Sequence, residues 1–194
     1  MTPTPRSYLS FPPEVLLQAQ GTGAGIKAAI FDVDGVLTDG TIWITEAGET
    51  LKNFNVLDGQ GLLMLRKGGI VPIVITGRDS AAVRRRISDL GLPHAAFGAS
   101  DKVAAANDIL QTLGVDWGDV AVIGDDWPDL PLFANAGFSC APANAHAEAL
   151  AAAHHVTTRE GGRGAAREFC DLLLMANGLY VPLMSKLLVT LDSK

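Results

Sequence analysis

Two kinds of hydrophobic pattern alternate along the chain. Largely apolar runs predict buried strands at 26–33, 70–76, 94–97, 119–125 and 138–142, and 154–158 is predicted as a last short strand. Segments with helical spacing follow them, at 60–69, 79–90, 101–113, 128–136, 145–153 and 167–176. Strands that alternate with helices are typical of a parallel sheet covered on both faces. The pattern therefore predicts an α/β fold with a doubly wound, Rossmann-like parallel sheet.

One pair of short apolar runs lies too close together for a helix to intervene. These runs, 41–45 and 50–56, flank a turn at 46–49 that contains Gly48. This arrangement predicts a β-hairpin, a flap spanning about 41–56. A hairpin of this size is too small to be a separate cap domain, so we expect no such domain.

Composition and charge narrow the class of protein. The chain has 194 residues, 48% of them hydrophobic, which supplies enough apolar material for a sizeable core. With 15 basic and 21 acidic residues, the formal net charge is −6. An acidic chain is a poor binder of nucleic-acid backbones, so we expect no nucleic-acid partner. Cys140 and Cys170 form no metal or disulfide motif and fit free thiols.

The two ends of the chain bear on localisation. Prolines interrupt the apolar residues of the first 17 positions, which do not resemble a signal peptide, so we expect a cytoplasmic protein. The segment 172–191 approaches the length of a membrane span, but Asn177, Gly178, Pro182 and Lys186 interrupt it. We expect no membrane partner, and instead an apolar tail that packs on a partner subunit.

Polar residues follow the predicted strands at the edge where ligands bind in such sheets. They are Asp32 and Asp34 after the first strand, Thr76 after the second, Lys102 at a helix start, and Asp125, Asp126 and Asp129 after a later strand. Two adjacent carboxylates repel by roughly 4 kcal/mol at an effective dielectric of 20, which a bound Mg²⁺ would offset. A hydroxyl and an ammonium group beside them could hold phosphoryl oxygens. The set predicts phosphoryl chemistry.

Other interpretations of these residues fit the pattern less well. A single Asp after a strand is commonly a helix cap or turn former, but this ordered set favours chemistry over capping. The chain has no GxxxxGK[ST] sequence, which excludes a P-loop. A non-catalytic phospho-accepting receiver module uses a similar set of Asp, Thr and Lys residues. In that module an acidic pair comes first in the chain and the phosphorylated Asp comes later. In this chain the order differs, because the DxD sequence comes first and the GDD sequence comes last.

Four motifs of this chain resemble those of the haloacid dehalogenase-like phosphatases. They are FDVDGVLTDG (31–40), ITGR (75–78), DK (101–102) and GDDWPD (124–129). The segments NFNVLDGQG (53–61) and GGRGAAREFCDLLL (161–174) are similar to those of the 3-deoxy-D-manno-octulosonate 8-phosphate (KDO 8-phosphate) phosphatase family. The resemblance covers 26–178, which we take as the domain. It leaves 1–25 as an N-terminal extension and linker, and 179–194 as a C-terminal tail.

The resemblance implies a mechanism for these residues. Asp32 would be the nucleophile that forms an aspartyl-phosphate, and Asp34 would be the general acid and base. Mg²⁺ would be held by the Asp32 side chain, the Asp34 backbone carbonyl and Asp125. The phosphoryl group would be clamped by Thr76 and Lys102. Asp126 and Asp129 would orient the metal shell or the lysine.

The resemblance also implies a substrate and an assembly. The substrate would be a sugar-acid phosphate, KDO 8-phosphate, used in lipopolysaccharide precursor synthesis. The residues expected near it are Asn55, Asp58, Gly59, Arg78 and Arg86. Leu57 and Leu63 stand where some members of the family have Arg, so a related nine-carbon sugar-acid phosphate is the alternative substrate. The assembly would be a homotetramer in which one subunit's flap and tail close the neighbour's site.

Overall fold

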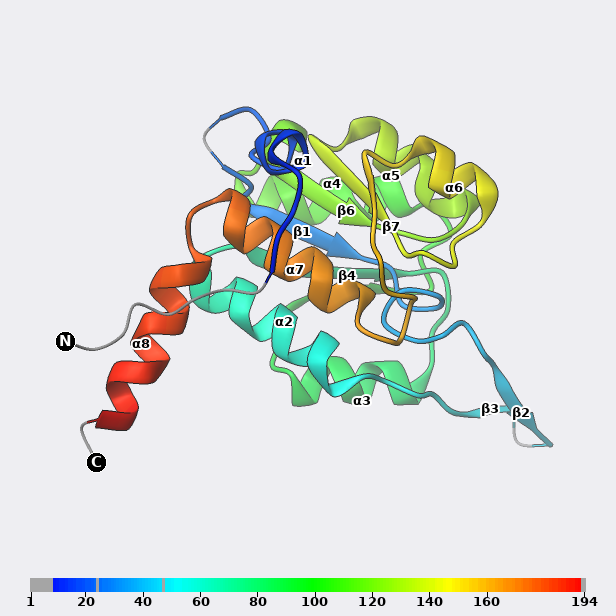
Figure 1. The fold of residues 1–194 in the computed structure, drawn as a ribbon. Coiled ribbons are helices and arrows are strands. Elements are labelled where there is room, and N and C mark those ends of the chain that lie inside the picture. The colour runs from blue at the N-terminus through cyan, green and yellow to red at the C-terminus, as the bar shows by residue number, and fades with distance from the viewer. Residues whose placement is uncertain (1–8, 24, 47, 193–194) are drawn as a thin grey trace.

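A computed structural model of the protein describes residues 9–23, 25–46 and 48–192. In this part of the chain one six-stranded sheet has the order β5-β4-β1-β6-β7-β8, and every neighbouring pair is parallel (Figure 1). Its strands are β1 (Ala28–Phe31), β4 (Val71–Thr76), β5 (His94–Phe97), β6 (Val120–Ile123), β7 (Phe138–Ala141) and β8 (His155–Val156). The predicted doubly wound α/β fold is confirmed.

Helices cover both faces of the sheet (Figure 1). One face packs against α1 (Pro13–Gln18), α2 (Val56–Gly68), α3 (Ala81–Asp89) and α7 (Ala165–Ala176). The other packs against α4 (Lys102–Leu113), α5 (Leu130–Asn135) and α6 (Ala147–Ala152). Strand β1 serves both faces because its side chains alternate: Ala29 and Phe31 join the first core cluster, and Ala28 and Ile30 the second. This two-sided burial is why β1 is apolar throughout.

The flap is shorter than predicted. It consists of β2 (Trp43–Thr45) and β3 (Gly48–Leu51), which pair antiparallel. The prediction of a strand through position 56 is wrong, because Asn55 is the N-cap of α2 and its side chain accepts a hydrogen bond from the Leu57 backbone N–H at 2.8 Å. That bond satisfies a free N–H group of the first helical turn, so the chain turns into a helix there. No separate cap domain occurs among the described residues.

Helices α1 and α8 (Tyr180–Asp192), the first and last helices of the described residues, both pack on α7. The segment expected as an extension carries α1, which packs on α7, and Ala19 after it is fully buried. The apolar stretch 172–191 is divided: α7 ends at Ala176, and α8 projects from the body (Figure 1). Among the described residues, no helix combines the length and apolar character needed to cross a bilayer. Whether α8 packs on a partner subunit stays a prediction.

Candidate active site

The candidate site lies at the carboxyl edge of the three central strands. Strand β1 sits between β4 and β6, so the residues that follow these strands are neighbours in space. Asp32 follows β1, Thr76 ends β4, and Asp125 comes two residues after β6. The chain passes from one side of β1 to the other at this point, which is the usual ligand-binding position of a doubly wound sheet. An open groove of about 380 Å³ lies here.

Lys102 joins the two carboxylates at the base of the groove. Its Nζ lies 2.8 Å from Oδ1 of Asp32 and 2.7 Å from Oδ1 of Asp129. All three residues are buried, with at most 8% of their surface exposed. Burial lowers the pKa of Lys102, but the two carboxylates outweigh it and the pKa is raised overall. Lys102 is therefore a fixed positive charge at the place where Asp32 would meet an anion.

Asp129 organises the loop that carries Asp125. While its Oδ1 accepts from Lys102, its Oδ2 accepts the backbone N–H of Asp125 at 3.0 Å and that of Asp126 at 3.4 Å. The side chain of Asp126 is exposed and accepts the N–H of Trp127, as the cap of a short 3-10 helix (Trp127–Asp129). The contacts of Asp129 fit the orienting role that we expected of it. The Asp126 side chain instead caps a helix.

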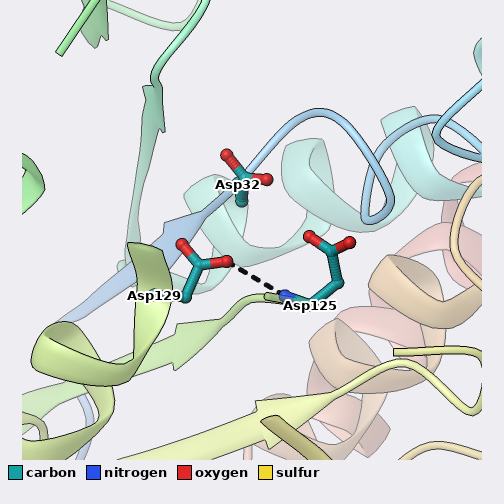
Figure 2. A group of neighbouring side chains, drawn as sticks. All are labelled: Asp32, Asp125 and Asp129. Carbon is teal, nitrogen blue, oxygen red and sulfur yellow. Dashed lines mark hydrogen bonds between the residues drawn. The ribbon is translucent and has the colours of Figure 1, made fainter. Parts of the chain in front are cut away.

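Three carboxylates surround one space at the groove floor. Figure 2 shows Asp32, Asp125 and Asp129, which can each place one oxygen within 4.8 Å of the others. Burial and the charges of Asp32 and Asp129 raise the pKa of Asp125 to about 8. Burial and Asp129 raise the pKa of Asp32 to about 6, against the opposing effect of Lys102. A bound divalent cation would hold carboxyl groups with raised pKa values in their ionised form at neutral pH, so this cluster of three carboxylates fits a metal site.

Two glycines allow backbone and carboxylate to approach in this site. A Cβ on Gly35 would lie 2.0 Å from Oδ2 of Asp125. A Cβ on Gly161, in the GGRG segment, would lie 1.7 Å from the carbonyl oxygen of Gly35. The neighbouring Gly162 donates its N–H to the carbonyl of Val36 at 2.9 Å. The GGRG segment thus packs directly on the loop that carries Asp34.

Thr76 and Arg78 form the opposite wall of the groove. Thr76 is 1% exposed, and its hydroxyl accepts the backbone N–H of Arg78 at 3.3 Å. The Arg78 side chain is about half exposed and reaches Oδ2 of Asp34 at 3.8 Å. The structure thus gathers eight of the predicted site residues on one groove: Asp32, Asp34, Thr76, Arg78, Lys102, Asp125, Asp126 and Asp129.

Four predicted substrate residues gather in a different place, around the start of α2. Arg86 of α3 donates from Nη2 to the backbone carbonyl of Asn55 at 3.4 Å. Gly59 permits this approach, because a Cβ there would lie 2.3 Å from the same nitrogen. Asp58 is 1% exposed and accepts the backbone N–H of Arg167, in the first turn of α7, at 2.8 Å. These contacts join α2, α3 and α7, and contact with substrate stays a prediction.

Two charged residues outside the predicted set contact residues that line the groove. Lys52 contacts the carboxylate of Asp34, and Glu49 of β3 contacts both Lys52 and Arg78. Their signal in the sequence is weak, because charged residues are common in exposed hairpins. The contact depends on β3 leading the chain back to the loop after β1, and sequence spacing does not show which side chains meet there.

Comparison with known proteins supports the same interpretation. A family model for haloacid dehalogenase-like hydrolases matches residues 97–169. A Yersinia pestis protein named 3-deoxy-D-manno-octulosonate 8-phosphate phosphatase KdsC is 46% identical over 153 residues, which are 79% of this chain and 82% of that protein. The chain belongs to the KdsC family of haloacid dehalogenase-like phosphatases.

Solved structures of KdsC-family phosphatases share the fold. The Yersinia pestis 3-deoxy-D-manno-octulosonate 8-phosphate phosphatase matches with a TM-score of 0.82 and 43% identity, over 87% of this chain and 89% of that one. The Moraxella catarrhalis enzyme, solved with a magnesium ion, a phosphate ion and KDO, matches with a TM-score of 0.83 and 38% identity, over 90% and 98%. This chain is thus a KdsC-family phosphatase, and its groove carries the acidic cluster expected of one.

Proposed function

We propose that this protein hydrolyses KDO 8-phosphate to KDO and phosphate in a reaction that depends on Mg²⁺. One observation carries the proposal: buried Lys102 joins Asp32 and Asp129 beside Asp125, at the edge of the sheet. This arrangement offers a nucleophile, a fixed cation and a cation site within one groove, as phosphoryl transfer requires. The Yersinia pestis and Moraxella catarrhalis relatives supply the choice of sugar acid.

In the proposed reaction, Asp32 and Asp34 divide the chemistry. A carboxylate oxygen of Asp32 attacks phosphorus in line, and the bond to the sugar oxygen breaks, leaving an aspartyl-phosphate. Asp34 gives its proton to the departing sugar oxygen. It then takes a proton from the water that attacks the aspartyl-phosphate, which restores Asp32 and releases phosphate. Asp34 is partly exposed and lines the groove beside Asp32, as both steps require.

Lys102 and Thr76 are proposed to hold the transferring group. Lys102 is already charged and immobile between two carboxylates, so little rearrangement accompanies phosphate binding. Mg²⁺ would be held by Asp32, Asp125 and the backbone carbonyl of Asp34, and when bound it would neutralise charge between the nucleophile and the phosphate. Asp129 has both oxygens occupied by Lys102 and backbone N–H groups, which suits it to orienting its neighbours.

The proposed function is tested by phosphate release from KDO 8-phosphate in the presence of Mg²⁺. The wild type should turn over, and Asp32→Asn should lose activity by at least about 10³-fold, because the nucleophile is gone. Asp116→Asn is the matched control, since Asp116 is an exposed carboxylate outside the groove. Full activity in Asp32→Asn would overturn the mechanism.

The same assay separates the alternatives. A higher kcat/KM for a nine-carbon sugar-acid phosphate would replace the proposed substrate and keep the reaction. Stable phosphorylation by a small phosphodonor, without turnover, would support a phospho-accepting receiver module. The order of the motifs and the relationship to KdsC favour the enzyme.

A homotetramer is also part of this proposal. The flap exposes Trp43, Ile44 and Leu51, with 56%, 75% and 58% of their surfaces accessible. Apolar surface of this kind is typical of an interface between subunits. Sedimentation equilibrium would test the assembly: four copies are expected, and a monomer at micromolar concentration would contradict it. The cytoplasmic localisation expected from the sequence stays a prediction.

A further inference from the structure

The flap contacts the groove through charged side chains, although its strands are largely exposed. The side chain of Lys52, which directly follows β3, has 0% of its surface accessible, and that of Glu49 has 16%. Burying a lysine ammonium is unfavourable unless opposite charges face it. The carboxylates that contact Lys52 therefore offset the cost of burying its charge.

Lys52 lies in a network of alternating charges. Its Nζ contacts Oδ1 of Asp34 and lies 3.1 Å from Oε1 of Glu49. Arg78 faces the other oxygen of each carboxylate, at 3.8 Å from Asp34 and 3.6 Å from Glu49. The two cations thus hold both oxygens of Asp34. Lys52 is the closer and the more buried of the two, since about half of the Arg78 side chain is exposed.

We infer that Lys52 is a positioning residue that holds the carboxyl group of Asp34 in its orientation for proton transfer to the leaving sugar oxygen. The inference rests on the proposed function, in which Asp34 is the general acid. Asp34 lies in a loop after β1, with 21% of its side chain accessible, so its carboxyl group can rotate unless a partner fixes it. A general acid acts only within hydrogen-bond reach of the atom that it protonates.

A leaving-group comparison separates this role from simple anchoring of the flap. A sugar alkoxide is a poor leaving group and needs a proton as it departs, whereas p-nitrophenolate departs without one. Departure of the leaving group precedes hydrolysis of the aspartyl-phosphate, so kcat/KM reports on it. Loss of a positioned general acid lowers kcat/KM for the sugar phosphate and spares p-nitrophenyl phosphate. Loss of flap structure alone lowers both to the same extent.

The decisive variant is Lys52→Met, which keeps the apolar stem and removes the charge. With Mg²⁺ present, kcat/KM for KDO 8-phosphate should fall about 10²-fold, the usual cost of a displaced catalytic group. The value for p-nitrophenyl phosphate should change less than about threefold, and Lys52→Arg should recover most of the lost activity. The matched control is Lys27→Met, since Lys27 is a half-exposed lysine paired with Asp119 and should leave both values unchanged.

Inhibition by the product KDO separates positioning from direct sugar binding. The inhibition constant of KDO should be the same in wild type and Lys52→Met. If this constant rises in Lys52→Met as kcat/KM falls, Lys52 contacts the sugar directly and the inference is overturned. Equal losses on both substrates, or no loss on either, would also overturn it. A wild type that hydrolyses p-nitrophenyl phosphate but not KDO 8-phosphate would contradict the proposed substrate. In that case, kcat/KM for an alkyl phosphate that the enzyme does hydrolyse replaces the value for KDO 8-phosphate. The same outcomes then support or overturn the positioning role of Lys52.

Discussion

Replacing Asp125 with Asn should stabilise the metal-free protein and abolish its activity. In the described part of the chain, the Asp125 carboxylate accepts no side-chain or backbone hydrogen bond that would favour its charge, and Asp32 and Asp129 lie beside it. Burial and these two anions raise its pKa from 3.8 to about 8. An amide of the same shape removes the ionisable group, and with it the conflict among three carboxylates.

The magnitude follows from the pKa shift. A carboxyl group whose pKa is raised by folding contributes stability that is fully present below about pH 4 and is lost as the pH rises toward 8. One pKa unit corresponds to about 1.36 kcal/mol, so the loss in the wild type reaches at most about 4 kcal/mol at pH 7. The Asn amide must itself be buried, so we expect Asp125→Asn to gain about 2–4 kcal/mol there.

The assay is urea unfolding of wild type and Asp125→Asn in EDTA at several values between pH 4 and pH 8. The difference in unfolding free energy should be near zero at pH 4 and should grow with pH. Saturating Mg²⁺ should then cancel most of this difference. At 100 times its Kd a ligand stabilises the folded state by about 2.7 kcal/mol, and only the wild type keeps the site intact. Phosphate release should be absent from the variant throughout.

Asp126→Asn is the matched control, because Asp126 is exposed and Asn can also accept the hydrogen bond from Trp127. This variant should gain far less stability than Asp125→Asn, because the charge of Asp126 makes only a minor contribution to the raised pKa of Asp125. If Asp125→Asn in EDTA is no more stable than the wild type at pH 7, the acidic cluster is not strained and the reasoning fails. A gain that does not depend on pH would also refute it, since the cause would then not be ionisation.

Two further outcomes are expected. Gly161→Ala should lower stability by about 1–3 kcal/mol and reduce phosphatase activity, because the new Cβ would collide with the Gly35 backbone. Thermal unfolding and a kcat measurement check this. Unchanged values in the variant would show that the loop can move to accommodate the Cβ. Burial raises the pKa of Asp58, so wild-type stability from this group falls as the pH rises above about 4. In urea unfolding between pH 4 and pH 7, the unfolding free energy of Asp58→Asn should fall less than that of the wild type. If the two free energies fall by the same amount with pH, the expectation is contradicted.

The sequence determined the fold class and the catalytic edge of the sheet. Apolar runs mark strands that are buried on both faces, and polar residues directly after them must gather where parallel strands end. The strand pattern therefore suffices to place Asp32, Thr76 and Asp125 together. Their neighbours in the motifs followed from the resemblance to a known family. The local signal failed at the flap, where Asn55 caps a helix in a segment whose apolar residues predict a strand.

Only the tertiary structure decided which side chains contact one another across long stretches of chain. Lys52 and Asp34 are 18 positions apart, and their contact exists because β3 leads the chain back to the loop after β1. Asp58 and Arg167 are 109 positions apart and meet because α2 packs on α7. Strand and helix patterns report local periodicity and burial, which neighbouring residues largely determine. Ion pairs and caps between distant segments depend on the packing of whole elements, and no local pattern records that packing.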